Sequence, residues 1–167
     1  DCNGVFKLYR HINPIKLFRS KISKGRRSKR EFEALSRLAQ AGVPCSEPLG
    51  FFCGRTPEAD RCEVLVTKCI EGGDTLEALA GEGRGFAHLD LASLFKIVRQ
   101  SHESGTYHGA LSPRNILVTG DAEAEPGFYL IDMERSILFP YDISGTRMGW
   151  RDLLSLCMYV SRYEGTD

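Results

Sequence analysis

The chain has 167 residues, of which 42% are hydrophobic and 26% charged, and its formal net charge is zero. These values are typical of a soluble globular protein with one domain or two small lobes. No uninterrupted apolar run in the sequence approaches the roughly 18 residues that a membrane-spanning helix needs. The start, DCNGVFKLYR, lacks both Met and a signal-peptide pattern, so we expect an excerpt or a processed product.

Three segments in the first half of the chain have the pattern of β-strands. Residues 4–10, GVFKLYR, alternate apolar and charged positions, as a half-buried strand does, which places Lys7 and Tyr9 on one face. The apolar segments 49–53 and 62–70 predict two further strands joined by a polar connection.

A helix is predicted between the first two of these strands, over residues 28–44. Ser28 could cap its start and Gly42 can end it. Its apolar side chains recur at helical spacing. The expected buried stripe consists of Phe32, Leu35, Leu38 and Ala39.

The second half of the chain has a more helical pattern. A short helix is expected over 75–80, a longer one over 89–105, and a strongly apolar one over 149–163. The segments 115–119 and 127–133 predict a pair of short strands around an acidic turn. Strands and helices are therefore mixed, which favours an α+β fold.

The six cysteines do not indicate a disulfide framework or a zinc site. They are irregularly spaced, no C-x-x-C pair occurs, and the four histidines do not cluster with them. Reduced thiols in a cytosolic protein are the favoured interpretation.

The basic segment, residues 16–30, contains no acidic residue. It could be a solvated connector, or it could contact phosphates, anionic lipid headgroups or nucleic acid. The scarcity of aromatic residues within it makes nucleic acid an unlikely partner.

Four residues have the chemistry that phosphoryl transfer from ATP requires. Lys7 lies mid-strand, Glu31 lies in the expected first turn of the next helix, and the two could form an ion pair. Asn115 and Asp132 lie at the ends of the predicted hairpin, where an amide and a carboxylate suit Mg²⁺. Taken singly, each has an ordinary explanation as a surface lysine, a helix-dipole partner or a turn former.

The order of these residues carries a family resemblance. Strand Lys, helix Glu, His-x-x-Leu-x-x-x-Asn and an apolar strand ending in Asp resemble the protein-kinase-like fold. The stretches FKLYR, REFEALSRLAQAGVPCSEPLG, GTYHGALSPRNILV and FYLIDMERS are similar to the bacterial lipopolysaccharide core kinase family, including the Kdo kinases. The resemblance runs from about residue 4 to about residue 160.

The resemblance implies a nucleotide site with ATP and Mg²⁺ as cofactors. Lys7 would contact the ATP phosphates with Glu31 as its partner. The connector 66–71, with Thr67 and Cys69, would hold adenine through backbone groups.

The resemblance also implies roles in the second half of the chain. Asn115 and Asp132 would hold Mg²⁺, and His108 would be a structural member of the catalytic loop. Asp152 would brace that loop from the final helix.

The chain departs from the family pattern at the catalytic base. Kinases of this type carry Asp two residues after the loop histidine, whereas this chain has Ala110. Alanine cannot accept a proton, and a missing general base typically costs about 10²–10⁴ in rate.

The resemblance also implies two lobes, with the N-lobe truncated before the lysine strand. A partial N-lobe over 1–70 and a partial C-lobe over 71–167 are expected, with a hinge near 70–85. The family's glycine-rich loop and its two strands would stand before Lys7, where this sequence has only a few residues.

Three functions follow as expectations. The first is ATP-dependent transfer to a sugar of the lipopolysaccharide core, or to another phosphate acceptor, with Ala110 limiting the rate. It implies a cytoplasmic protein, peripheral at the inner membrane if the basic segment meets anionic headgroups. The second is a pseudokinase that binds a nucleotide or a partner without transfer. The third and least favoured is nucleic-acid binding.

Overall fold

The computed structural model describes residues 4–11, 27–55, 61–81, 86, 89–120 and 127–164. Its strands are β1 (Gly4–His11), β2 (Pro48–Arg55), β3 (Arg61–Lys68), β4 (Asp74–Thr75), β5 (Thr106–Tyr107), β6 (Ile116–Thr119), β7 (Gly127–Leu130) and β8 (Ile137–Leu138). Its α-helices are α2 (Arg27–Gln40), α3 (Leu76–Leu79), α4 (Leu91–Glu103) and α5 (Arg147–Glu164), with 3-10 turns η2 (Pro113–Asn115) and η3 (Met133–Arg135). This mixture confirms the predicted α+β class.

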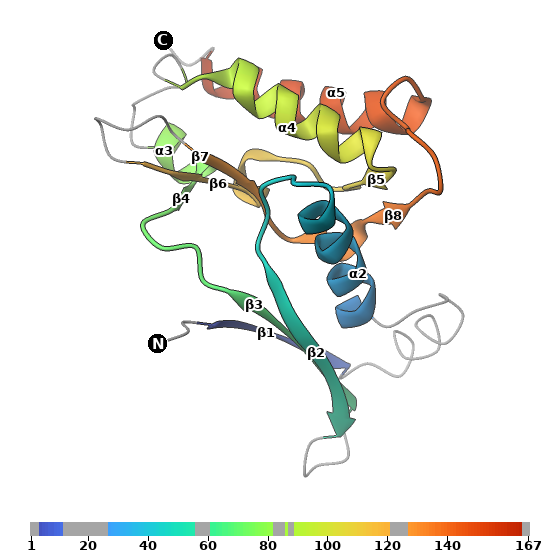
Figure 1. The fold of residues 1–167 in the computed structure, drawn as a ribbon. Coiled ribbons are helices and arrows are strands. Elements are labelled where there is room, and N and C mark those ends of the chain that lie inside the picture. Colours follow the sequence, from blue (N-terminus) through green and yellow to red (C-terminus); the bar gives the residue numbers. More distant parts are fainter. Residues whose placement is uncertain are drawn as a thin grey trace.

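The first three strands form an antiparallel sheet in the order β1-β3-β2. Helix α2 packs against β2 and β3, and Figure 1 shows this sheet at the bottom of the view with α2 above it. The predicted alternation of β1 is confirmed, because Tyr9 is buried while Phe6, on the opposite face, is 72% exposed. Lys7 pairs with Leu65 of β3 in the ladder. Because side chains alternate along a strand, Lys7 lies on the same face of β1 as Tyr9, two residues further on.

Helix α2 ends as predicted but begins differently. Gly42 adopts a φ of 70°, and the amide of Val43 donates to the carbonyl of Leu38 at 2.9 Å, which closes the helix. Ser28 lies inside the helix, and its amide and hydroxyl both donate to the Glu63 carboxylate of β3. The prediction of a Ser28 cap was therefore wrong, because a neighbouring strand supplies the acceptor.

The predicted buried stripe of α2 is confirmed at Leu35 and Leu38 and wrong at Ala39. Ala34, Leu35 and Leu38 are buried, whereas Ala39 is exposed. Phe32 is half-buried and its ring lies 5.2 Å from that of Phe51 on β2. The buried face of the helix therefore contains Leu35 and Leu38 as expected, with Ala34 in place of Ala39.

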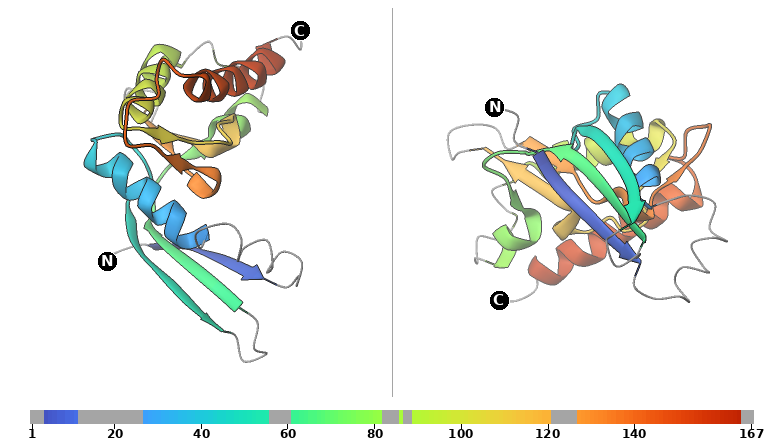
Figure 2. Two further views of the ribbon diagram at one scale, coloured as in Figure 1. Left: turned by 90° about the vertical axis from the view of Figure 1, so that its right-hand side faces the viewer. Right: turned by 90° about the horizontal axis from the view of Figure 1, so that it is seen from below.

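The remaining strands and helices form a second group. The β6–β7 hairpin extends to β4 on one side, and β5 pairs with β8 in a separate two-stranded ladder. Helices α4 and α5 lie at the end of the molecule away from the β1-β3-β2 sheet (Figures 1 and 2). The side chain of Asp90 accepts from the amides of Ala92 and Ser93 and so caps α4.

Strand β7 is shorter than the predicted 127–133. It ends at Leu130, and Asp132 adopts a left-handed backbone with a φ of 58° before η3 begins. Left-handed residues do not continue a strand. The apolar segment FYLIDM therefore predicted a strand that is too long. The other predicted strand, 115–119, begins one residue later than expected, because Asn115 lies in η2.

One continuous core joins the two groups of elements. It includes Leu35 and Leu38 of α2 together with Ile116 of β6, Leu130 of β7 and Leu156 of α5. None of the described helices is long and apolar enough to cross a bilayer. Cys45, Cys53, Cys62, Cys69 and Cys157 are unpaired thiols.

Candidate active site

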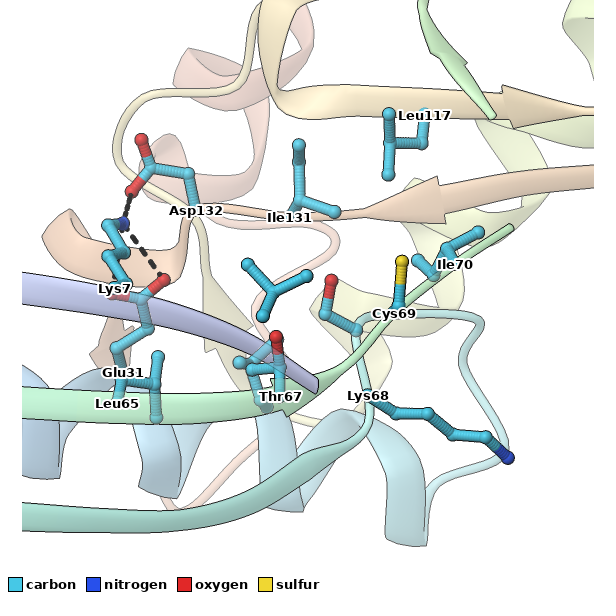
Figure 3. Close-up of a pocket in the computed structure, with 13 residues that line it drawn as sticks. Lys7, Glu31, Leu65, Thr67, Lys68, Cys69, Ile70, Leu117, Ile131 and Asp132 are labelled. Atoms are coloured by element: carbon cyan, nitrogen blue, oxygen red, sulfur yellow. Dashed lines mark hydrogen bonds and ion pairs between the residues drawn. The ribbon is translucent and has the colours of Figure 1, made fainter. Parts of the chain in front are cut away.

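A cavity of about 310 Å³ lies between the β1-β3-β2 sheet and the β6–β7 hairpin. Most of its wall is apolar, as Figure 3 shows for Leu65 on one side and Leu117 and Ile131 on the other. Thr67, near the end of β3, and Cys69, just beyond it, line the same cavity. Its size and apolar walls match the range of small-molecule sites.

Lys7 lies at one end of this cavity, between two carboxylates. Its ammonium donates to both oxygens of Glu31, each at 3.1 Å, and contacts the carboxylate of Asp132 (Figure 3). Burial alone would lower the pKa of Lys7, but hydrogen bonds and charge attraction from Asp132 and Glu31 more than reverse this and raise it. The amine is therefore held as a cation, which is the form that binds phosphate.

Glu31 is a buried carboxylate in the second turn of α2, one turn later than expected. Besides Lys7, it accepts a hydrogen bond from the hydroxyl of Tyr9. Burial raises the pKa of Glu31 against the opposing effects of Tyr9 and Lys7. Tyr9 was not predicted as a site residue. The β-strand period that put Tyr9 on the face of Lys7 was the available signal.

The loop from His108 to Asn115 is fixed to α5 through Asp152, a buried carboxylate. Its two oxygens accept from the amides of His108, at 2.8 Å, and Gly109, at 3.0 Å. Gly109 has a φ of 76°, and a Cβ there would lie 2.5 Å from the carbonyl oxygen of Arg135. The loop therefore requires glycine beside the histidine.

The ring of His108 is buried and neutral. Its Nε2 lies 3.1 Å from the carbonyl oxygen of Ile131, the residue before Asp132, and so donates to it. Its Nδ1 is buried with no partner among the described residues. Burial disfavours the charged ring and lowers the pKa of His108, and the opposing attraction of the Asp152 carboxylate does not reverse this.

We expect this histidine to make folding sensitive to mild acid. Below its ordinary pKa of about 6.5 the unfolded chain binds a proton that the folded chain cannot, so stability falls as the pH falls. The contribution is about 1 kcal/mol between pH 6.5 and 5.5. Urea unfolding should show a smaller loss of stability over this range for His108→Gln than for the unsubstituted chain. Equal losses would contradict a neutral buried ring.

Asn115 and Asp132 line a second cavity, of about 150 Å³, next to the first. The amide nitrogen of Asn115 donates to the carbonyl of Ala110 at 2.8 Å, which leaves its oxygen as an acceptor. The carboxylate of Asp132 is 42% exposed. One amide and one carboxylate fit Mg²⁺, which is usually bound by one or two carboxylates together with substrate phosphates. Within the described residues, no group of three or more His, Cys, Asp or Glu side chains forms a self-sufficient metal site.

The structure thus brings the predicted site residues to one cleft and the loop beside it. Lys7, Glu31 and Asp132 are in contact, and Ala110 lies with Asn115 and Asp132 on the second cavity. Three further residues that line this second cavity were not predicted as site residues: Arg114, Glu134 and Arg135. Most of the basic segment, 16–26, lies outside the described residues.

The sequence also matches a known family model. The model for the lipopolysaccharide kinase (Kdo/WaaP) family matches residues 2–162. The chain belongs to this family. The predicted resemblance is therefore confirmed, and kinase-like function follows at the level of the family.

Two curated proteins that the chain resembles are both kinases. The 3-deoxy-D-manno-octulosonic acid kinase of Actinobacillus succinogenes is 29% identical over 109 residues, which cover 65% of this chain and 45% of that protein. The serine/threonine-protein kinase RIO1 of Chaetomium thermophilum is 32% identical over 119 residues, or 66% of this chain and 21% of the relative. The chain spans less than half the length of these two curated relatives.

A solved structure supports the fold. WaaP, solved in complex with acyl carrier protein, superposes with a TM-score of 0.65 at 18% identity, covering 79% of this chain and 58% of that chain. The chain thus has the protein-kinase-like fold. The lobe boundary at residue 70 and the individual roles of the site residues remain predictions.

Proposed function

We propose that this chain binds Mg-ATP in the cleft and is a kinase-like protein whose phosphoryl transfer to a lipopolysaccharide core sugar is slow. The observation that carries the proposal is Lys7, a cation held between Glu31 and Asp132 at the end of an apolar cavity. An apolar cavity suits a nucleobase, and a fixed cation beside it suits the phosphates.

Each residue would have a separate task. Glu31, with Tyr9, fixes the ammonium of Lys7 toward the phosphates. Asn115 and Asp132 would hold Mg²⁺, which neutralises charge on the phosphates when it is bound. Thr67 and Cys69 would lie against the base. Positioning and charge compensation supply most of the catalysis of phosphoryl transfer, and these residues provide both.

The acceptor hydroxyl, however, has no evident base. Ala110 lines the second cavity beside Asn115 and Asp132, and its methyl group cannot take the proton of an attacking hydroxyl. This position favours a second candidate function, a pseudokinase that binds nucleotide without transfer. The two candidates share the nucleotide site and differ only in the rate of the chemical step.

Membership of the family supports a proposal for the acceptor and the location. A lipopolysaccharide core sugar as acceptor implies a cytoplasmic protein that works at the inner membrane surface. The basic segment, residues 16–30, would then meet anionic headgroups. The WaaP structure contains acyl carrier protein, and a similar partner is a further candidate for this chain.

The nucleotide site is tested by thermal unfolding with and without Mg-ATP. We expect a rise in Tm that requires Mg²⁺, equivalent to about 2.7 kcal/mol when the ligand is at 100 times its Kd. Lys7→Ala should abolish most of this rise because it removes the phosphate cation. Lys96→Ala, an exposed lysine on α4, is the matched control and should keep it. No rise for the unsubstituted chain at millimolar Mg-ATP would refute the proposed site.

A further inference from the structure

The second cavity, of about 150 Å³, differs in character from the first. It is lined by Ala110, Arg114, Asn115, Asp132, Glu134 and Arg135. Asp132 lines both cavities. If nucleotide fills the apolar cavity, a phosphoryl group at Asp132 faces the second cavity, which is then the place of the acceptor. Its small volume suits a single compact group and not a drug-sized molecule.

The two carboxylates of this cavity already have cationic partners outside it. Asp132 contacts the ammonium of Lys7. Glu134 lies 3.2 Å from a guanidinium nitrogen of Arg27, at the start of α2. Without a bound nucleotide or Mg²⁺, each carboxylate is therefore already compensated by a cation outside the cavity.

The two arginines of the cavity are in the opposite situation. Arg114 and Arg135 have no ion-pair or hydrogen-bond partner for their guanidinium groups anywhere in the described part of the chain. Both are exposed side chains that a ligand can reach. Ala110, which also lines the cavity, contributes no negative charge. The cavity is thus left with positive charge that nothing in the described structure compensates.

We propose that Arg114 and Arg135 form an anion-binding subsite, so that the molecule in this cavity carries a carboxylate or a phosphate. Guanidinium groups bind both anions through paired, charge-assisted hydrogen bonds. The assignment of the cavity to the acceptor rests on the proposed function. The binding of an anion there does not, since it depends only on the uncompensated arginines.

Isothermal titration with three sugars of similar size tests the subsite. D-glucuronate carries a carboxylate, glucose 6-phosphate carries a phosphate, and glucose carries neither. Each sugar is titrated both with and without Mg-AMP-PNP. With the nucleotide site filled, a charged sugar cannot bind in the place of the nucleotide phosphates and be mistaken for a ligand of the subsite. We expect at least one charged sugar to bind about tenfold or more tightly than glucose. Which one does so identifies the anion as carboxylate or phosphate.

Substitutions test whether Arg114 and Arg135 cause the preference for a charged sugar over glucose. Arg114→Ala and Arg135→Ala should each weaken binding of the charged sugar about tenfold, and the double variant should bind it no better than glucose. Arg99→Ala, an exposed arginine on α4 paired with Glu103, is the matched control and should change nothing.

Two results would overturn the subsite: equal affinity for all three sugars, or a charge preference that persists in the double variant. The proposed function is judged separately, by the Mg-ATP thermal shift. If the charge preference is present without that shift, the subsite stands and the kinase assignment of the cleft fails. If the shift is present without the preference, the cleft stands and the subsite fails.

Discussion

Ala110→Asp is expected to raise phosphoryl transfer by about 10²–10⁴-fold, the usual contribution of a positioned general base. The new carboxylate would extend into the cavity that Ala110 shares with Asn115 and Asp132. An aspartate at this position would be ionised at neutral pH, since its ordinary pKa is about 3.9. The measurement is the initial rate of transfer from labelled ATP to deacylated lipopolysaccharide core oligosaccharide.

Ala110→Asn is the matched control for this gain. Asparagine has nearly the size and shape of aspartate but cannot take a proton, so its rate should stay near that of the unsubstituted chain. Each variant is first checked for the Mg-ATP thermal shift, which reports an intact nucleotide site. A variant with Asp at 110 that keeps the shift but gains no activity would favour the pseudokinase, because the defect would then extend beyond the base.

The sequence predicted the long elements well because their periodicity reflects burial. In α4, Leu94 and Val98, four positions apart, are both buried, as the helical spacing of apolar residues indicates. The pattern could not predict β5 or β8, each of two residues, because two residues have no period. It also extended β7 to Met133, since hydrophobicity does not indicate the left-handed turn at Asp132.

Within the site, the sequence could predict residue types but not most of their partners. Lys7 was expected to pair with Glu31, and the structure adds Tyr9 and Asp132 to this pair. These contacts join residues up to 125 positions apart, which no local pattern encodes. Arg114 was not predicted as a site residue for a related reason. The sequence does not show that the acidic side chains near it form ion pairs with other residues.

The second large effect is expected in stability, for Asp152→Ala. The carboxylate of Asp152, 1% exposed, accepts from the amides of His108 and Gly109 and lies 3.3 Å from Nε2 of His102. Alanine would leave two backbone donors without an acceptor in a buried loop, at about 1–3 kcal/mol each. We therefore expect the free energy of unfolding to fall by about 2–5 kcal/mol, measured by urea denaturation.

Asp142→Ala provides the matched control. Asp142 is an exposed aspartate that accepts one backbone hydrogen bond, from Ser144 at 2.7 Å, so water can replace it and the loss should stay below about 1 kcal/mol. The loss of unfolding free energy for Asp152→Asn should lie between those of the two alanine variants. The asparagine amide keeps one acceptor oxygen, but its NH₂ group would face the second backbone N–H donor. If Asp152→Ala were as mild as Asp142→Ala, α5 would not hold the loop through this carboxylate. The position of Ala110 and Asn115 would then have to be set by the loop's own packing.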